Sequence, residues 1–263
     1  MRREDYPWLH ALTAPPQMAG PARRLAQEGV RADAAERAVE GVARALAEEG
    51  PLTRAQLRER IAARGVRTEG QAPIHVLMLA CLRGLAVRGP MAGREQAYVL
   101  VRDWIGAPAA VDRDAALAEL ARRYLAGHGP ASDRDLARWS GLPLRDARTG
   151  LRAIASELEQ REDGLVDLAR PAAEAIPPPR LLGAFDPLLL GWASREPLLG
   201  PHQGVVTVNG IFRPFALVGG RAAATWRVAG GEVALEPFTR LTRRATAALQ
   251  ADAQDVVRFL ART

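Results

Sequence analysis

The chain has no lysine and only one cysteine, and these absences limit the kinds of basic side chain, crosslink and metal site that it can have. All 36 of its basic residues are arginine. The single cysteine, Cys81, excludes an internal disulfide and a cysteine-rich zinc site. Because Cys81 lies in an apolar run between Val76 and Leu82, we expect a buried, unreactive thiol.

Long hydrophobic runs and ligand-binding motifs are also missing. No run approaches the roughly 20 apolar residues of a membrane span, and the N-terminal MRREDYPWLHALTAPPQ lacks the apolar core of a secretory signal. We therefore expect a cytoplasmic protein without a membrane partner. No glycine-rich phosphate loop and no His/Cys/Asp cluster with ligand spacing is present, so we expect no cofactor and no metal.

What the chain has instead is positive charge, with a net charge of +6 and an isoelectric point near 10.7. Arginine donates bidentate hydrogen bonds to phosphates and base edges, so this charge favours a nucleic-acid partner. Abundant Arg, Ala, Gly and Leu also fits the codon usage of a GC-rich genome. The charge is uneven, at +4 for residues 1–110, −1 for 111–170 and +4 for 180–263.

An internal repeat organises the first two thirds of the chain. Residues 46–57 read LAEEGPLTRAQL and residues 125–136 read LAGHGPASDRDL, an offset of 79 positions. In each copy a helix precedes a Gly-Pro break. A hydroxyl residue, Thr53 or Ser132, follows the break and can cap a short helix.

Both copies predict the same order of elements. The first predicts helices at 34–47, 53–64 and 71–84, then two strands within 85–101 around 89–93, with Trp104 closing the unit. The second predicts helices at 115–126, 132–139 and 144–158, then a hairpin at 159–168 that turns at 162–164. Helix, short helix, glycine-containing turn, helix and hairpin form the winged helix-turn-helix pattern.

The pattern changes after a predicted linker, Ile176-Pro177-Pro178-Pro179. Strands are expected at 205–208, 211–218, 222–228 and 232–236, with two-residue turns at Gly219-Gly220 and Gly230-Gly231. An amphipathic helix is expected at 242–260. The predicted fold class is α+β, with tandem winged helix-turn-helix units followed by a small antiparallel β domain with a C-terminal helix. The predicted domains are a packing segment at 1–30, winged-helix units at 31–110 and 111–175, and the β domain at 180–263.

The third helix of the second copy carries the leading candidate DNA-binding residues. Arg145, Arg148 and Arg152 lie at i, i+3 and i+7 and form a stripe beside the apolar face. A recognition helix needs such a stripe to contact base edges and phosphates in the major groove. The alternative is an ordinary solvated face, with Asp146 and Glu157 nearby.

The matching helix of the first copy is too apolar to read DNA well. Gln71 and His75, at i and i+4, are its one polar pair before Arg83. A histidine among apolar neighbours is most often a hydrogen-bonded core residue, and a functional contact is the alternative. We expect this helix to pack against another unit.

Arginines also lie on the predicted β domain. Arg213 lies in Gly210-Ile211-Phe212-Arg213-Pro214, at the start of one predicted strand, and Arg221 and Arg227 lie on or beside the next. A hairpin that presents arginines could follow a phosphate backbone, or these could be ordinary outward-facing strand residues. Trp226, between them, is expected in the core.

Several ordered motifs resemble those of the crosslink-repair DNA glycosylase (AlkZ/YcaQ-like) family. They are GPASDRDLARWSGLPLRDARTGLRAI at 129–154, LLGAFDPLLLGWASREPLL at 181–199 followed by His202, GIFRPFALVGGRAAATW at 210–226, and VALEPF at 233–238. The resemblance implies tandem winged helices around a concave DNA-binding face and a C-terminal β domain. It also implies double-stranded DNA as the partner, with alkylated or crosslinked DNA as the substrate of the family's enzymes.

The family's catalytic signature is a Gln-x-Gln or Gln-x-Asp triplet in an N-terminal unit, which would position and polarise a water. Residues 1–12 resemble the segment after that unit, so we expect the chain to begin beyond it, with a misplaced start at Met1 as the alternative. Gln250-Ala251-Asp252 has the right letters but belongs to the C-terminal helix. No catalytic residue is therefore assigned.

The leading hypothesis is a bacterial DNA-binding protein without catalysis. An active DNA glycosylase, a winged-helix protein-interaction module and a ligand-sensing repressor stay open as alternatives, and self-association is a further partner hypothesis.

Overall fold

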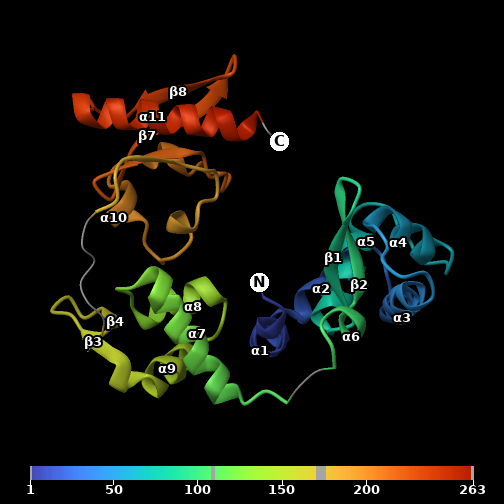
Figure 1. Ribbon diagram of the computed structural model, residues 1–263. Coiled ribbons are helices and arrows are strands. Elements are labelled where there is room, and N and C mark those ends of the chain that lie inside the picture. The colour runs from blue at the N-terminus through green and yellow to red at the C-terminus, as the bar shows by residue number, and fades with distance from the viewer. Residues whose placement is uncertain (1, 108–109, 170–175, 262–263) are drawn as a thin grey trace. The chain divides into compact units, whose positions relative to one another are not determined.

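The computed structural model describes residues 2–107, 110–169 and 176–261. These residues form a mixed α and β structure with small antiparallel sheets and a C-terminal helix (Figure 1). The chain packs as two units. One comprises Met1–Ala121 and Ser140–Ile154, and the other comprises Arg122–Trp139 and Ala155–Thr263. The domain boundaries expected from the sequence stay a prediction, and residue 175, where the second winged-helix unit was expected to end, lies outside the described residues.

The first unit opens with helices that pack around α5. In chain order its elements are η1 (Arg3–Asp5), α1 (Tyr6–Thr13), η2 (Pro15–Gln17), α2 (Ala19–Gln27), α3 (Ala32–Glu49), α4 (Arg54–Ala62), α5 (Ala72–Leu82), β1 (Ala86–Ala92), β2 (Glu95–Leu100) and α6 (Val101–Trp104). Helices α2 and α3 both pack against α5. Strands β1 and β2 form an antiparallel hairpin beside α5 (Figure 1). Packing of α5 against another unit was predicted, whereas its neighbours α2 and α3 belong to its own unit.

One apolar core joins these elements. Leu57 and Ile61 of α4 are completely buried, because their i, i+4 spacing turns both toward α3 and α5. Val42 of α3 and Val76 of α5 are equally inaccessible. Burial of each such side chain stabilises the fold by roughly 1.5–3 kcal/mol.

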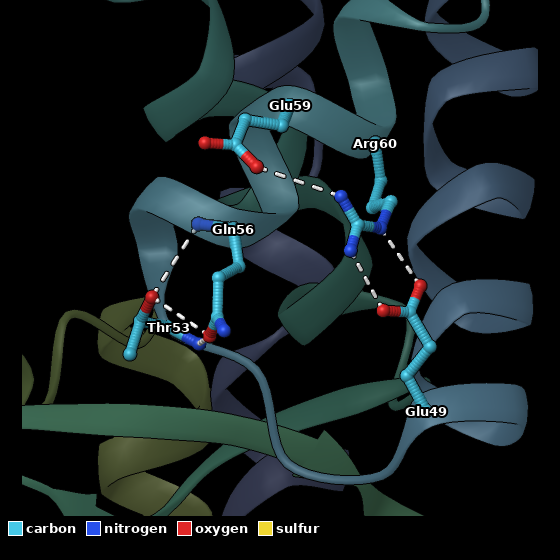
Figure 2. Close-up of polar contacts among 5 residues, drawn as sticks. All are labelled: Glu49, Thr53, Gln56, Glu59 and Arg60. Atoms are coloured by element: carbon cyan, nitrogen blue, oxygen red, sulfur yellow. Dashed lines mark hydrogen bonds and ion pairs between the residues drawn. The ribbon is translucent and has the colours of Figure 1, made fainter.

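The start of α4 is fixed by reciprocal hydrogen bonds (Figure 2). The Thr53 hydroxyl accepts from the Gln56 N–H at 3.4 Å, and the Gln56 side-chain oxygen accepts from the Thr53 N–H at 2.8 Å. Farther along the helix, Arg60 makes two 2.8 Å hydrogen bonds to the Glu49 carboxylate of α3. The Thr53–Gln56 hydrogen bonds thus define the start of α4, and the Arg60–Glu49 hydrogen bonds link it to α3.

The second copy repeats these local features. Its elements are α7 (Arg113–His128), α8 (Asp133–Ser140), α9 (Leu144–Ala153), η3 (Ala155–Glu157), β3 (Leu158–Gln160) and β4 (Val166–Leu168). Ser132 and Asp135 exchange hydrogen bonds at 3.2 and 2.8 Å, as Thr53 and Gln56 do. Isolated bridges also correspond, since Leu52 pairs with β2 and Ala131 pairs with β4.

The end of the second unit is a four-stranded antiparallel sheet in the order β5-β6-β7-β8. Its elements are β5 (Arg180–Leu182), η4 (Pro187–Leu189), α10 (Glu196–Leu199), η5 (Gln203–Val205), β6 (Phe215–Val218), β7 (Arg221–Ala229), β8 (Glu232–Pro237) and α11 (Arg243–Leu260). Helix α11 lies along the sheet (Figure 1) and packs against β5 and β8, with Leu249 completely buried. Both glycine pairs have positive φ, from 59° to 82°, as the predicted two-residue turns require.

Two strand predictions in this sheet were wrong. Val205 ends the 3-10 turn η5 and Val206 makes a single bridge to Phe212, because Thr207 and Gly210 close a tight turn. The next strand begins at Phe215 rather than Ile211, since Pro214 has no N–H to donate to the ladder. Strand β5, which pairs with β6, was not predicted.

Other boundaries also differ from the predictions. Helix α9 ends at Ala153 instead of 158, because Leu158 pairs with Leu168 as the first residue of β3. The β1–β2 turn lies at residues 93–94, later than expected, and β1 continues through 89–92 with a register shift. Trp226 is only partly buried, and its indole N–H donates to the Leu182 carbonyl at 2.9 Å.

Two helical glycines provide a test of the close contact between α7 and α9. A Cβ on Gly150 would lie 2.5 Å from the Leu117 carbonyl oxygen, whereas a Cβ on Gly127 would meet nothing within 4 Å. We expect Gly150→Ala to lower the free energy of unfolding by roughly 1–3 kcal/mol, because a backbone carbonyl cannot move aside cheaply. The matched variant Gly127→Ala should raise it by up to about 1 kcal/mol. Urea unfolding of both variants measures the difference, and equal midpoints would show that the contact is not tight.

Candidate nucleic-acid interface

The arginine stripe predicted on α9 is present and exposed. Arg145, Arg148 and Arg152 are all exposed, and the Arg145 side chain retains 85% of its accessible surface. Ala147 and Gly150, on the other face of the helix, are buried. Arg152 donates to the Thr149 hydroxyl at 3.1 Å, a contact that leaves its charge uncompensated.

The acidic residues near this stripe have other partners. Asp146 is buried and accepts a 2.7 Å hydrogen bond from Arg113, while Arg145 approaches it at 3.7 Å. Glu157 accepts two 2.8 Å hydrogen bonds from Arg122, which hold the pKa of its carboxyl below the usual range. The two carboxylates expected beside the stripe thus make their shortest contacts with arginines outside it.

The β-domain arginines do not form a single patch on the hairpin. Arg221 pairs with Val218 beside the β6–β7 turn, whereas Arg213 lies two residues before Phe215 at the other end. Both side chains are exposed, and neither has an ion-pair partner among the described residues. Arg227 lies within 3.5 Å of the Glu236 carboxylate and is partly compensated.

The structure separates the predicted polar pair on α5. Gln71 is exposed at the N-cap position, and its backbone carbonyl accepts from the His75 N–H at 3.2 Å. The His75 side chain is half-buried, and its Nδ1 is buried without a hydrogen-bond partner in the described structure. The prediction of a hydrogen-bonded core histidine is therefore wrong at Nδ1.

Sequence reasoning missed a second group of exposed arginines in the first unit. Arg54 and Arg58, at i and i+4 on α4, line a groove of about 600 Å³ with Ile74 of α5. Two carboxylates, Glu59 and Glu95, also line this groove. The i, i+4 spacing of these two arginines could have identified the group from the sequence.

The Gln-x-Asp triplet in the C-terminal helix has a structural role. The Asp252 carboxylate accepts from the Arg180 guanidinium at 3.0 Å and from the Leu181 N–H at 2.6 Å. These contacts join α11 to β5 and occupy both carboxylate oxygens. His202 stacks on Phe238 with ring centroids 4.5 Å apart.

The residues that the structure describes contain no group of three or more His, Cys, Asp or Glu side chains arranged to hold a metal ion. No helix among them is long and apolar enough to cross a membrane.

Comparison with known proteins decides the family. The sequence profile described as DNA glycosylase AlkZ-like matches residues 1–259. The chain belongs to the AlkZ-like DNA glycosylase family. A solved structure, Streptomyces sahachiroi DNA glycosylase AlkZ, superposes with a TM-score of 0.77 at 25% sequence identity, covering 98% of this chain and 75% of that chain. No match to a curated protein was found.

The family membership inferred from the ordered motifs is therefore confirmed over nearly the whole chain. The AlkZ-like fold also supports the mixed α and β architecture with its C-terminal helix.

The thiol of this AlkZ-like chain gives a prediction about reactivity. Burial raises the pKa of Cys81 to about 11 from an ordinary value near 9.0. At pH 8 the thiolate fraction then falls about a hundredfold, and the greater nucleophilicity of a more basic thiolate recovers only part of that loss. We expect iodoacetamide to alkylate native Cys81 at least about tenfold more slowly than the unfolded chain, with a rate that rises with pH up to about 10. Equal rates in the native and unfolded protein would contradict this assignment.

Proposed function

We propose that this chain binds duplex DNA through the exposed arginine face of α9. The observation that carries the proposal is the stripe of Arg145, Arg148 and Arg152 on one helix face. Guanidinium groups spaced along a helix can contact phosphates on both sides of a major groove and the base edges within it. Membership of a DNA glycosylase family supports DNA as the partner.

Repeated local structure supports tandem winged helices as the scaffold. In each copy three helices precede a two-stranded hairpin, and the residue after the Gly-Pro turn bridges to the second hairpin strand. This order places α5 and α9 as the third helices, which enter the groove in winged helix-turn-helix proteins. Of the two, α9 carries the arginines, and α5 is packed by α2 and α3.

Arg213 and Arg221 would add contacts to the phosphate backbone. Each is exposed and lacks an ion-pair partner in the described part of the chain. Their separation along the β6–β7 hairpin suits two phosphates rather than one.

On catalysis, we propose that the described residues bind DNA without excising a base. The one Gln-x-Asp triplet has its carboxylate engaged by Arg180 and the Leu181 N–H, so it does not position a water. The alternative is an active glycosylase for alkylated or crosslinked DNA, and the family favours it.

The DNA-binding proposal predicts a loss of affinity on removal of the stripe. We expect the triple variant with Arg145, Arg148 and Arg152 changed to Ala to bind an undamaged duplex at least about tenfold more weakly in low salt. The slope of log K against log[salt] should become shallower by about 0.9 for each lost phosphate contact. Fluorescence anisotropy across a salt series measures both quantities.

A matched control changes three arginines that already have carboxylate partners. Arg31 and Arg37 bind Asp33, and Arg258 binds Asp255. Their triple Ala variant removes the same charge. An equal loss of affinity in this variant would show that net charge, and not the position of the arginines on α9, accounts for DNA binding.

The catalytic proposal predicts no abasic product. Incubation of the chain with a duplex carrying an alkylated purine, followed by alkaline cleavage, should give no strand break above background. Accumulation of a break with time would establish the glycosylase alternative, and loss of that break in Asp252→Asn would reverse the structural assignment of Asp252.

A further inference from the structure

A groove between η2, α2 and α5 in the first unit has a lining that fits an anion. Its volume is about 640 Å³, within the range of small-molecule sites. Its polar lining comes from three segments of the chain: Gln17 of η2, then Arg23, Arg24 and Gln27 of α2, and His75 of α5. No carboxylate lines it, whereas Glu59 and Glu95 line the groove beside α4.

The two guanidinium groups of the groove carry uncompensated charge. Arg23 is exposed and makes no hydrogen bond or ion pair with any described residue. Arg24 donates to the side-chain oxygen of Gln27 at 3.1 Å, a neutral partner. On the neighbouring helix α3, by contrast, Arg37 is paired with Asp33 at 2.8 Å. Two adjacent arginines without a carboxylate form a positive site.

The amides and the histidine also present donors. Since the Gln27 oxygen faces Arg24, its amide NH₂ is left to donate elsewhere. The His75 Nδ1 is buried without a partner, so the neutral ring is most stable with its hydrogen on Nε2, because an orphaned buried N–H costs more than an orphaned lone pair. The Nε2 has no hydrogen bond within the described structure and is not among its buried atoms, so solvent reaches it.

We propose that this groove binds a phosphate group through Arg23, Arg24, Gln27 and His75. Two guanidiniums, an amide NH₂ and an imidazole N–H supply donors and no competing acceptor charge, and such charge-assisted hydrogen bonds to phosphate are strong. The volume exceeds that of phosphate alone, and Met78 with Pro16 and Pro21 provides an apolar wall for an attached sugar or base. The phosphate comes either from a free nucleotide or from a DNA backbone.

Histidine NMR of the full chain tests the site directly. The protein has four histidines, so ¹⁵N-labelled imidazoles give few signals, and His75→Gln assigns the relevant one. Titration with inorganic phosphate, and separately with deoxyadenosine 5′-monophosphate, should shift the His75 Nε2 signal with a saturable dependence. We expect the half-saturation concentration to rise at least about tenfold in Arg23→Ala/Arg24→Ala.

A matched control and a folding check accompany this variant. Arg31→Ala/Arg37→Ala removes the same charge nearby but from arginines that already bind Asp33, so its titration should stay close to that of the parent. Arg23→Lys/Arg24→Lys keeps the charge and should recover part of the affinity. Circular dichroism confirms that each variant is folded, as expected for exposed side chains.

Duplex binding of the same variants identifies the source of the phosphate. For a backbone phosphate, Arg23→Ala/Arg24→Ala weakens duplex affinity and lowers the salt slope by about 1–2. For a free nucleotide, that variant loses only the small-molecule titration. The α9 triple variant keeps the His75 shift in either case, which separates this site from the proposed DNA interface.

Two results would overturn the proposal. One is an unchanged His75 signal with both probes up to about 50 mM, where even a weak site fills, together with parental duplex affinity in Arg23→Ala/Arg24→Ala. The other is an equal loss in Arg31→Ala/Arg37→Ala, which would indicate nonspecific charge.

Discussion

A reciprocal pair of backbone hydrogen bonds holds each repeat copy together. The Leu52 N–H donates to the Tyr98 carbonyl at 3.1 Å, and the Leu52 carbonyl accepts from the Tyr98 N–H at 2.7 Å. Ala131 and Val166 exchange the same two backbone bonds at 2.9 Å each. In both copies this pair stands between a Gly-Pro turn and a capped helix. The residue that joins the hairpin therefore also fixes where α4 or α8 begins, and a shift of one residue would break the bridge and the cap together.

On this shared scaffold, the pairing of arginines decides which surfaces can attract phosphate. With 36 arginines and 30 acidic residues, most of the positive charge can be neutralised internally. Arg60, Arg83 and Arg122 are bound to carboxylates and stabilise contacts between elements. Segment charge alone was therefore a poor guide, because residues 111–170 carry a net charge of −1 and still present the exposed α9 stripe, while Asp146 and Glu157 are bound by Arg113 and Arg122.

The features that the sequence predicted are those determined by near neighbours. Thr53 and Ser132 act as caps, and the glycine pairs at 219–220 and 230–231 turn the hairpins, because each depends on residues within a few positions. The errors arose where distant pairing decides. Strand β5 is a strand only because it pairs with β6. The β-branched residues 205–208 do not form the predicted strand, because the chain turns there instead. The α2–α5 groove could not be predicted, since it joins residues more than 40 positions apart.

The difference between α5 and α9 follows from how each helix is covered. Pro21 and Leu25 of α2 are buried, and this i, i+4 pair turns Arg23, Arg24 and Gln27 to the open side of the helix. Packing of α2 against α5 therefore places a polar edge along a helix that has almost no polar residues itself. Helix α5, which carries no arginine of its own, is thereby bordered by a row of guanidinium and amide donors. The two copies thus share one order of elements and differ in the source of their exposed donors, which is α9 itself in one copy and the neighbouring α2 in the other.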